Sequence, residues 1–279
     1  MTSTHLTRAG LVVAVAGGLA GATAYGLREL LVRQAAQARR AIGKPLGEQA
    51  PASDKHYKKK YGERVDLLVL GDSIAAGLGA ERPKHTLGSR LARGIARDTG
   101  RSVRLRTAAV VGSESSMLAG QLASLPRSYR PDVAVVVVGG NDVTHRVPVT
   151  ESVRHLAGAI EDLRARGAEV VVGTCPDLGA LRAVPQPLRA LGSRASRQLA
   201  AAQREAALER GARVVSLAHV VGPFFVTAPD EMFSLDRFHP SARGYKRTAK
   251  AMLPSVLAAL GVVQDLPFGH HAPDVGGSG

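Results

Sequence analysis

Cysteine, tryptophan and the other aromatic residues are scarce or missing in this sequence. The 279 residues include one cysteine, Cys175, and no tryptophan, and aromatic residues make up 4%. A single cysteine excludes a disulfide framework within the chain, and we expect Cys175 to be a small buried side chain. Because 45% of the residues are hydrophobic, a core can still form. It must consist of valine, leucine and alanine, which is typical of a buried parallel sheet.

Three familiar site motifs are absent or incomplete. There is no P-loop. The Gly-x-Ser-x-Gly pattern of α/β-hydrolases begins at Gly71 and Ser73 but has Ala75 where its last glycine belongs. The Gly-x-Gly-x-x-Gly pattern of dinucleotide-binding folds begins at Gly77 and ends on Arg82. The chain therefore carries the full signature of none of these classes.

Acidic residues are outnumbered, which leaves a net charge of +14. The arginines are scattered along helical patterns and no aromatic-studded basic strand accompanies them, so we predict no nucleic-acid partner. The densest basic cluster lies within residues 55–60. We interpret it as part of a solvated linker, with attraction to an anionic membrane surface as the alternative.

The N-terminal region has no charged residue from 9 to 27. A segment of this length after a short polar start predicts membrane targeting, by a signal peptide or an anchor. Two patterns disagree on its fate. Ala22, Thr23 and Ala24 resemble a processing site, which would release an exported enzyme. The arginines between 28 and 40 would instead keep an anchored domain in the cytoplasm.

The chain divides by composition into four parts. Residues 1–42 form the membrane-targeting helix with its basic extension, and 43–62 form a linker marked by proline, glycine and lysine. We expect the folded domain over 63–261. Residues 262–279 lack periodicity and are predicted to be a flexible tail, in which the adjacent His270 and His271 have no further metal ligands spaced around them.

Within the domain, apolar runs alternate with helical patterns. This alternation predicts a parallel sheet with helices on both faces. In such sheets, ligands bind at the carboxyl ends of the strands. The predicted strands cover 65–70, 103–110, 132–140, 169–174 and 212–217, and the predicted helices cover 86–98, 114–124, 150–166, 188–210 and 241–260.

Polar groups follow several of these strands. Ser73 comes after the first, Gly112 after the second, Asn141 after the third, and Asp236 and His239 lie just before the last helix. Together they supply a nucleophile, a base, an orienting acid and donors for an oxyanion, which is the set that acyl transfer needs. Two simpler interpretations remain, namely Ser73 as a helix cap and the Asp–His pair as metal ligands, although no third ligand accompanies that pair.

The motifs GDS at 71–73, Gly112, GGND at 139–142 and DRFH at 236–239 resemble those of the SGNH, or GDSL-type, hydrolase superfamily. The resemblance implies a flavodoxin-like three-layer α/β/α sandwich and esterase, lipase, thioesterase or carbohydrate-deacetylase activity without cofactor or metal. It implies Ser73 as nucleophile, His239 as base and Asp236 as orienting acid. The implied oxyanion hole consists of Ser73, Gly112 and Asn141, with Asp72 and Asp142 in support. The asparagine often found shortly before the glycine of the second motif is missing here.

We therefore expect a serine hydrolase that cleaves acyl esters through an acyl-enzyme. An acyltransferase or carbohydrate O-deacetylase with the same triad is the alternative, and a catalytically silent binding protein is a second one. Two apolar stretches, 175–194 and 220–233, are expected to line an acyl pocket near His239. The expected partner is a small-molecule or lipid ester.

Overall fold

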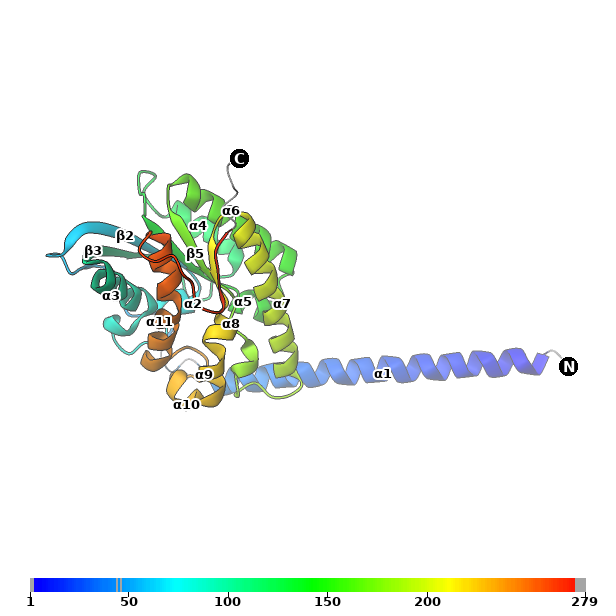
Figure 1. The fold of residues 1–279 in the computed structure, drawn as a ribbon. Helices are drawn as coiled ribbons and strands as arrows, with labels where there is room; N and C mark the ends of the chain where they lie inside the picture. The colour runs from blue at the N-terminus through cyan, green and yellow to red at the C-terminus, as the bar shows by residue number, and fades with distance from the viewer. Residues whose placement is uncertain (1–2, 44, 46, 274–279) are drawn as a thin grey trace, which may run out of the picture.

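The computed structural model describes the backbone of residues 3–43, 45 and 47–273, and the side chains of those among them that follow residue 22. Its centre is a seven-stranded sheet in the order β1-β3-β2-β4-β5-β6-β7 (Figure 1). The pairs from β3 to β6 are parallel, while β1 and β7 join the two edges in the antiparallel sense. The strands are β1 (His56–Tyr57), β2 (Gly62–Gly71), β3 (Arg101–Thr107), β4 (Val133–Val137), β5 (Glu169–Gly173), β6 (Arg213–Val215) and β7 (His270–His271).

Helices cover both faces of the sheet and bury alternate residues of its strands. On β2, Leu67 and Val69 face one hydrophobic cluster, whereas Leu68 and Leu70 face the other. The first cluster is completed by α3 (Leu87–Thr99) and α11 (Ala242–Ala259), and the second by α4 (Leu118–Ala123), α6 (Val149–Ala165) and α7 (Leu188–Glu209). The result is the three-layer α/β/α sandwich that the strand and helix alternation predicts, so the expected fold class is confirmed.

Short helices fill the connections at the carboxyl ends of the strands. One of them, α5 (Gly140–His145), begins where a strand stops earlier than its apolar run suggests. The run 132–140 ends as a strand at Val137, and its glycines lead into the next helix. The short helices are α2 (Ser73–Ala76), α5, α8 (Leu217–Val220), α9 (Gly222–Thr227) and α10 (Pro229–Met232), with 3-10 turns at Pro83–His85, Ser115–Met117 and Leu178–Ala180.

The two edges of the sheet depart from the predicted boundaries. Part of the expected linker is structured, because β1 pairs with β3 and the Tyr57 hydroxyl donates to the Ser53 carbonyl over 2.7 Å. The prediction of a flexible tail is wrong for His270 and His271, which form β7 against β6. The Ser255 hydroxyl also bonds His270 Nδ1 at 2.7 Å. Both edge strands have two residues, too few to show a strand period in the sequence.

Helix α1 (Ser3–Ile42) projects from the domain as one long helix (Figure 1). Its C-terminal part is docked, since Gln34 accepts a hydrogen bond from the Leu188 amide at 3.0 Å and donates to the Gln186 carbonyl. Ala38 is buried in the same contact region. Among the side chains that the structure describes, no helix combines the length and apolarity needed to cross a membrane. Residues 9–22 of the uncharged segment lie outside those side chains.

Candidate active site

The predicted site residues gather where the direction of the sheet connections changes. From β2 the chain goes to β3 on one side, then crosses back to β4 on the other side of β2. In open α/β sheets, such a switch point leaves a crevice beyond the carboxyl ends of the two central strands. Ser73 follows β2 and Asn141 follows β4, so both lie at this crevice.

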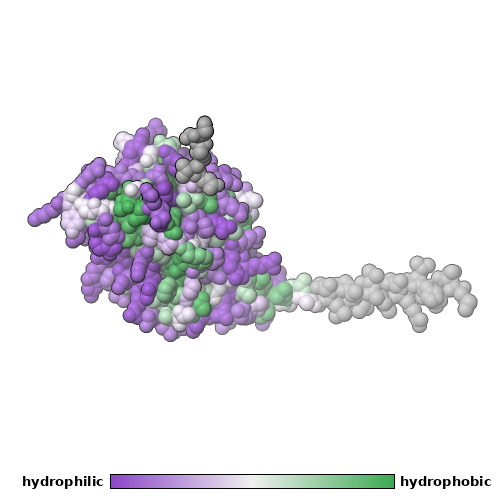
Figure 2. All heavy atoms as spheres, viewed as in Figure 1, coloured by the Kyte–Doolittle hydropathy of each residue, from purple (hydrophilic) through white to green (hydrophobic). Residues whose placement is uncertain are grey.

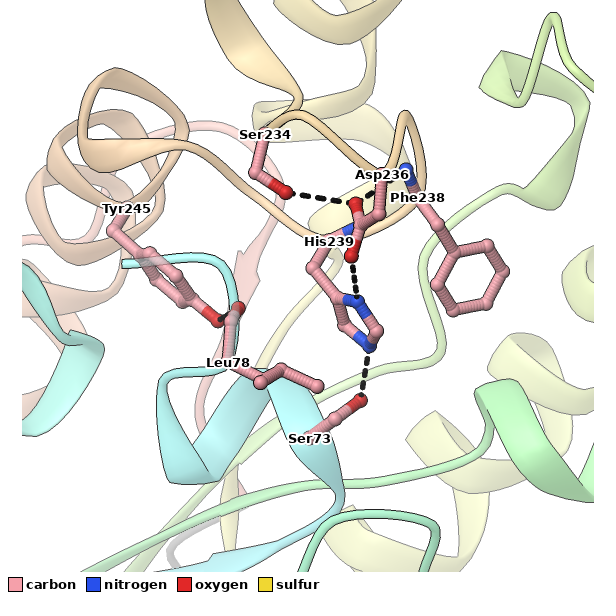
Figure 3. Close-up of polar contacts among 7 residues, drawn as sticks. All are labelled: Ser73, Leu78, Ser234, Asp236, Phe238, His239 and Tyr245. Atoms are coloured by element: carbon pink, nitrogen blue, oxygen red, sulfur yellow. Dashed lines mark hydrogen bonds and ion pairs between the residues drawn. The ribbon is translucent and has the colours of Figure 1, made fainter. Parts of the chain in front are cut away.

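Ser73, His239 and Asp236 form one chain of hydrogen bonds (Figure 3). The Ser73 hydroxyl lies 2.9 Å from His239 Nε2, and His239 Nδ1 lies 2.6 Å from Asp236 Oδ2. The two ring nitrogens therefore have different partners, one a hydroxyl and the other a carboxylate. This is the geometry in which an imidazole can accept a serine proton while a carboxylate stabilises its positive charge.

A tight turn holds the Asp236 carboxylate in place. Its Oδ1 accepts hydrogen bonds from the Ser234 hydroxyl at 2.7 Å and from the amides of Phe238 and His239 at 2.9 Å each. Burial alone raises the pKa of Asp236, but the hydrogen bonds from His239, Ser234 and these amides outweigh it and bring the pKa to about 2. Asp236 is thus a carboxylate throughout the neutral range.

The loop that carries Ser73 is capped by its neighbour. Asp72 is the N-cap of α2, and its Oδ1 accepts from the Ile74 amide at 2.9 Å. The interpretation of Ser73 as a helix cap is therefore wrong, and its hydroxyl is directed to His239. Burial raises the pKa of Asp72 to about 6.

Helix α11 ties the Ser73 loop to the His239 loop. The Tyr245 hydroxyl donates to the Leu78 carbonyl at 2.6 Å (Figure 3). The Leu78 amide in turn donates to the Ser73 carbonyl at 2.9 Å. Tyr245 is fully buried. Because α11 begins just after His239, this contact fixes the nucleophile segment relative to the base.

The loop after β3 meets the start of α5. Gly112 lies in a turn with φ of +85°, and the carbonyl of the next residue, Ser113, accepts from Asn141 Nδ2 at 2.9 Å. The buried Asp142 carboxylate accepts from the Ser115 amide at 3.2 and 3.1 Å. The structure thus brings Gly112 and Asn141 into adjoining segments, and Asp142 joins those segments.

Two buried glutamines near the strand ends carry bonds that sequence reasoning missed. Gln121 on α4 bonds both the N–H and the carbonyl of Gly71. Gln203 on α7 accepts from the Cys175 amide at 2.7 Å and donates to the Val138 carbonyl at 2.9 Å. Cys175 itself is fully buried as expected, and burial raises the pKa of its thiol well above the usual value.

An apolar cavity opens beside Ser73 and Asn141. Its walls come from both stretches expected to form an acyl pocket, with Leu178 and Leu181 from the first and Phe225 and Phe233 from the second. Apolar side chains also gather on the surface over α8 and α9 (Figure 2). The remaining apolar lining residues are Ile74, Pro176, Ala180, Leu217, Val221, Phe238 and Pro240.

Comparison with known proteins identifies the family. The model of the GDSL-like lipase/acylhydrolase family matches residues 69–247. The chain is 40% identical to the GDSL-like esterase Rv1075c of Mycobacterium tuberculosis, over 95% of this chain and 88% of that protein. Among solved structures, the match to TesA (TM-score 0.54, 23% identity) covers 70% of this chain and 99% of the TesA chain. The match to the psychrotrophic esterase EstA from Pseudoalteromonas (TM-score 0.56, 19% identity) covers 70% of this chain and 98% of the EstA chain. The chain therefore belongs to the GDSL-like lipase/acylhydrolase family and is a carboxylic ester hydrolase of the esterase and lipase type.

Proposed function

We propose that the protein hydrolyses acyl esters through an acyl-enzyme formed on Ser73. The observation that carries the proposal is the hydrogen-bonded chain from Ser73 Oγ through His239 to Asp236, which lies beside an apolar cavity. A hydroxyl becomes an effective nucleophile when an adjacent base removes its proton and a third group orients that base.

In the proposed reaction, Ser73 Oγ attacks the ester carbonyl while His239 Nε2 takes the hydroxyl proton. Asp236, a carboxylate at neutral pH, stabilises the imidazolium through Nδ1. The amides of Ser73 and Gly112 and the side chain of Asn141 bind the tetrahedral oxyanion. His239 then gives its proton to the leaving alcohol, and a water molecule repeats the sequence to release the acid and free Ser73.

The apolar cavity favours an acyl chain over a sugar acetate as the part of the substrate next to Ser73. Leu178, Leu181, Phe225 and Phe233 offer no hydrogen-bonding group to the hydroxyls of a carbohydrate but can bury a chain of methylenes, each worth about 0.8 kcal/mol. We therefore rank esterase or lipase action above carbohydrate O-deacetylation. Acyl transfer would use the same triad, with an alcohol in place of water.

The test is Ser73→Ala assayed on p-nitrophenyl esters of increasing acyl length. We expect wild-type turnover to rise with chain length up to the capacity of the cavity and Ser73→Ala to be inactive while folded. A fluorophosphonate should label the wild type and the exposed-serine control Ser128→Ala, but not Ser73→Ala. Full turnover by Ser73→Ala contradicts the nucleophile assignment. An unlabelled, inactive wild type favours the catalytically silent protein, and ester products in the presence of added alcohols favour acyl transfer.

We also propose that residues 9–27 bring the protein to a membrane, as a signal peptide or an anchor. The support is the uncharged stretch itself and its place in α1, which projects away from the domain. Full-length protein should be found in the membrane fraction or the cell envelope. N-terminal sequencing then decides its fate, since a new terminus at Tyr25 means cleavage and export. An uncleaved chain protected from external protease means a cytoplasmic domain, and full-length protein confined to the cytosol contradicts both versions.

A further inference from the structure

At the end of β2, a buried side chain bonds the backbone beside a loop residue, since the Gly71 carbonyl also accepts from the Val110 amide at 3.1 Å. Gly71, two residues before Ser73, donates its N–H to Gln121 Oε1 at 2.9 Å and accepts from Gln121 Nε2 at 2.8 Å. A hydrogen-bonded residue pair in an antiparallel sheet makes the same exchange of one N–H and one carbonyl. The Gln121 amide therefore holds both backbone groups of Gly71 in the segment that presents the nucleophile.

The same amide reaches the neighbouring loop. Gln121 Nε2 also donates to the Ser113 hydroxyl at 3.0 Å, and Ser113 directly follows Gly112. The Ser113 carbonyl in turn accepts from Asn141 Nδ2 at 2.9 Å. One continuous set of hydrogen bonds thus runs from Gly71 through Gln121 and Ser113 to Asn141. It connects the three segments that hold the proposed oxyanion donors.

Because these polar groups are buried, breaking their hydrogen bonds costs more free energy than it would at the surface. Gln121 is 4% exposed and Ser113 is fully buried, so water cannot replace a lost partner. Both N–H groups and the carbonyl of the Gln121 amide are used. A buried polar group left without a partner costs more than a hydrogen bond contributes, so the bonded arrangement is strongly preferred over a displaced one.

We propose that Gln121 is a positioning residue that sets the distance between the Ser73 loop and the Gly112–Asn141 donors. The inference rests on the proposed function, because it assigns Gln121 to the oxyanion side of that site. It also explains how the second motif of this chain dispenses with the asparagine often found before its glycine. Bonding to the loop comes from α4 instead, a helix that begins after the loop.

The test compares Gln121→Met with Gln34→Met in the full-length protein. Both glutamines are buried and bond backbone groups, but Gln34 joins α1 to the segment before α7. We expect Gln121→Met to lower kcat on a p-nitrophenyl ester about 10- to 100-fold with KM changed less than about twofold, since small misplacements of catalytic groups have effects of this size. Gln34→Met should keep kcat within about twofold of wild type.

A double variant separates positioning from general destabilisation. If Gln121 acts through the oxyanion donors, Gln121→Met combined with Asn141→Ala loses clearly less than the product of the two single losses. Losses that multiply in full overturn the proposal, as does wild-type kcat in folded Gln121→Met.

If Gln121→Met does not fold, the same kinetic measurement is made on Gln121→Glu. Its carboxylate keeps the shape and the acceptor for Gly71 but cannot donate, and the same loss of kcat is expected. Wild-type kcat in Gln121→Glu, or failure of both variants to fold, overturns the positioning role. The proposed function is judged separately, because an inactive Ser73→Ala beside an active wild type supports it whatever Gln121 does.

Discussion

The two halves of the candidate site are built in different ways. The acid–base half is local, because Asp236 and His239 lie three residues apart in one turn and bond each other at 2.6 Å. The oxyanion half is assembled from distant segments, with Gln121 bonding Gly71 across 50 residues and Asn141 bonding Ser113 across 28. Local geometry follows from a short motif, whereas assembled geometry depends on the whole fold. Substitutions in the two halves should therefore lower kcat to different extents.

The largest expected loss comes from the acid–base half, through Asp236→Asn. Asparagine keeps the shape of the turn but cannot stabilise the imidazolium or fix the His239 tautomer, and the corresponding change in a serine protease triad costs about 10⁴-fold in kcat. Steady-state kinetics on a p-nitrophenyl ester measures the loss. Circular dichroism should show a folded protein. A variant within tenfold of wild type would mean that Asp236 only shapes the loop.

The oxyanion half should lose less when one donor is removed. Asn141→Ala is expected to lower kcat about 100- to 1000-fold with a small change in KM, because the oxyanion forms only after substrate is bound. The amides of Ser73 and Gly112 remain to share the charge. A kcat within about threefold of wild type would make Asn141 a structural residue that only bonds Ser113.

The difference between the two halves also explains which parts of the site could be predicted from the sequence. Asp236 and His239 could be assigned to one turn because their spacing is part of the motif. The five central strands could be placed because apolar runs, some of them rich in valine, alternate with helical patterns. Gln121 and Gln203 could not, because a lone glutamine within a helical pattern usually faces solvent. Only the packing of α4 and α7 shows that both face the strand ends. The two-residue edge strands were missed because their pairing depends on distant chain segments.

Two glycines offer a matched comparison of the halves. Both have positive φ, +96° at Gly79 and +85° at Gly112, so alanine costs similar backbone strain at either. At Gly79 an added Cβ would lie 2.5 Å from the Pro240 carbonyl oxygen and 2.9 Å from His239 Cβ, whereas at Gly112 nothing lies within 4 Å.

We expect Gly79→Ala to lower kcat about 10- to 100-fold by displacing His239, since misplacement of a catalytic group by about 1 Å has effects of this order. Gly112→Ala keeps the backbone N–H and should lose only a few-fold. Parallel kinetics and thermal melts of the two variants check this order. A larger loss of kcat in Gly112→Ala would show that activity depends more on the backbone conformation at Gly112 than on the position of His239.

The smallest expected effect concerns stability and the two buried carboxylates, whose pKa values move in opposite directions. Asp236 has a folded pKa of about 2, below its unfolded value of 3.8, so the stability it contributes is present above pH 4 and is lost as the pH falls toward 2. Asp72 has a folded pKa of about 6. The folded state therefore binds more protons between pH 4 and 6, and stability from this group falls as the pH rises through that window.

The substitution Asp72→Asn removes the pH dependence of stability that comes from Asp72, while keeping a good N-cap for α2. Melting temperature measured from pH 4 to 7 should fall more with rising pH in the wild type than in Asp72→Asn, with a difference of a few degrees for a domain of this size. Asp236→Asn is the matched control, since its deficit in melting temperature relative to the wild type should stay constant from pH 4 to 7 and shrink only below pH 4. Parallel curves for Asp72→Asn and the wild type between pH 4 and 7 would show that Asp72 is already ionised throughout that range. In that case the burial beside Ser73 would carry no electrostatic cost, and the site would contain one perturbed carboxylate, on the acid–base half alone.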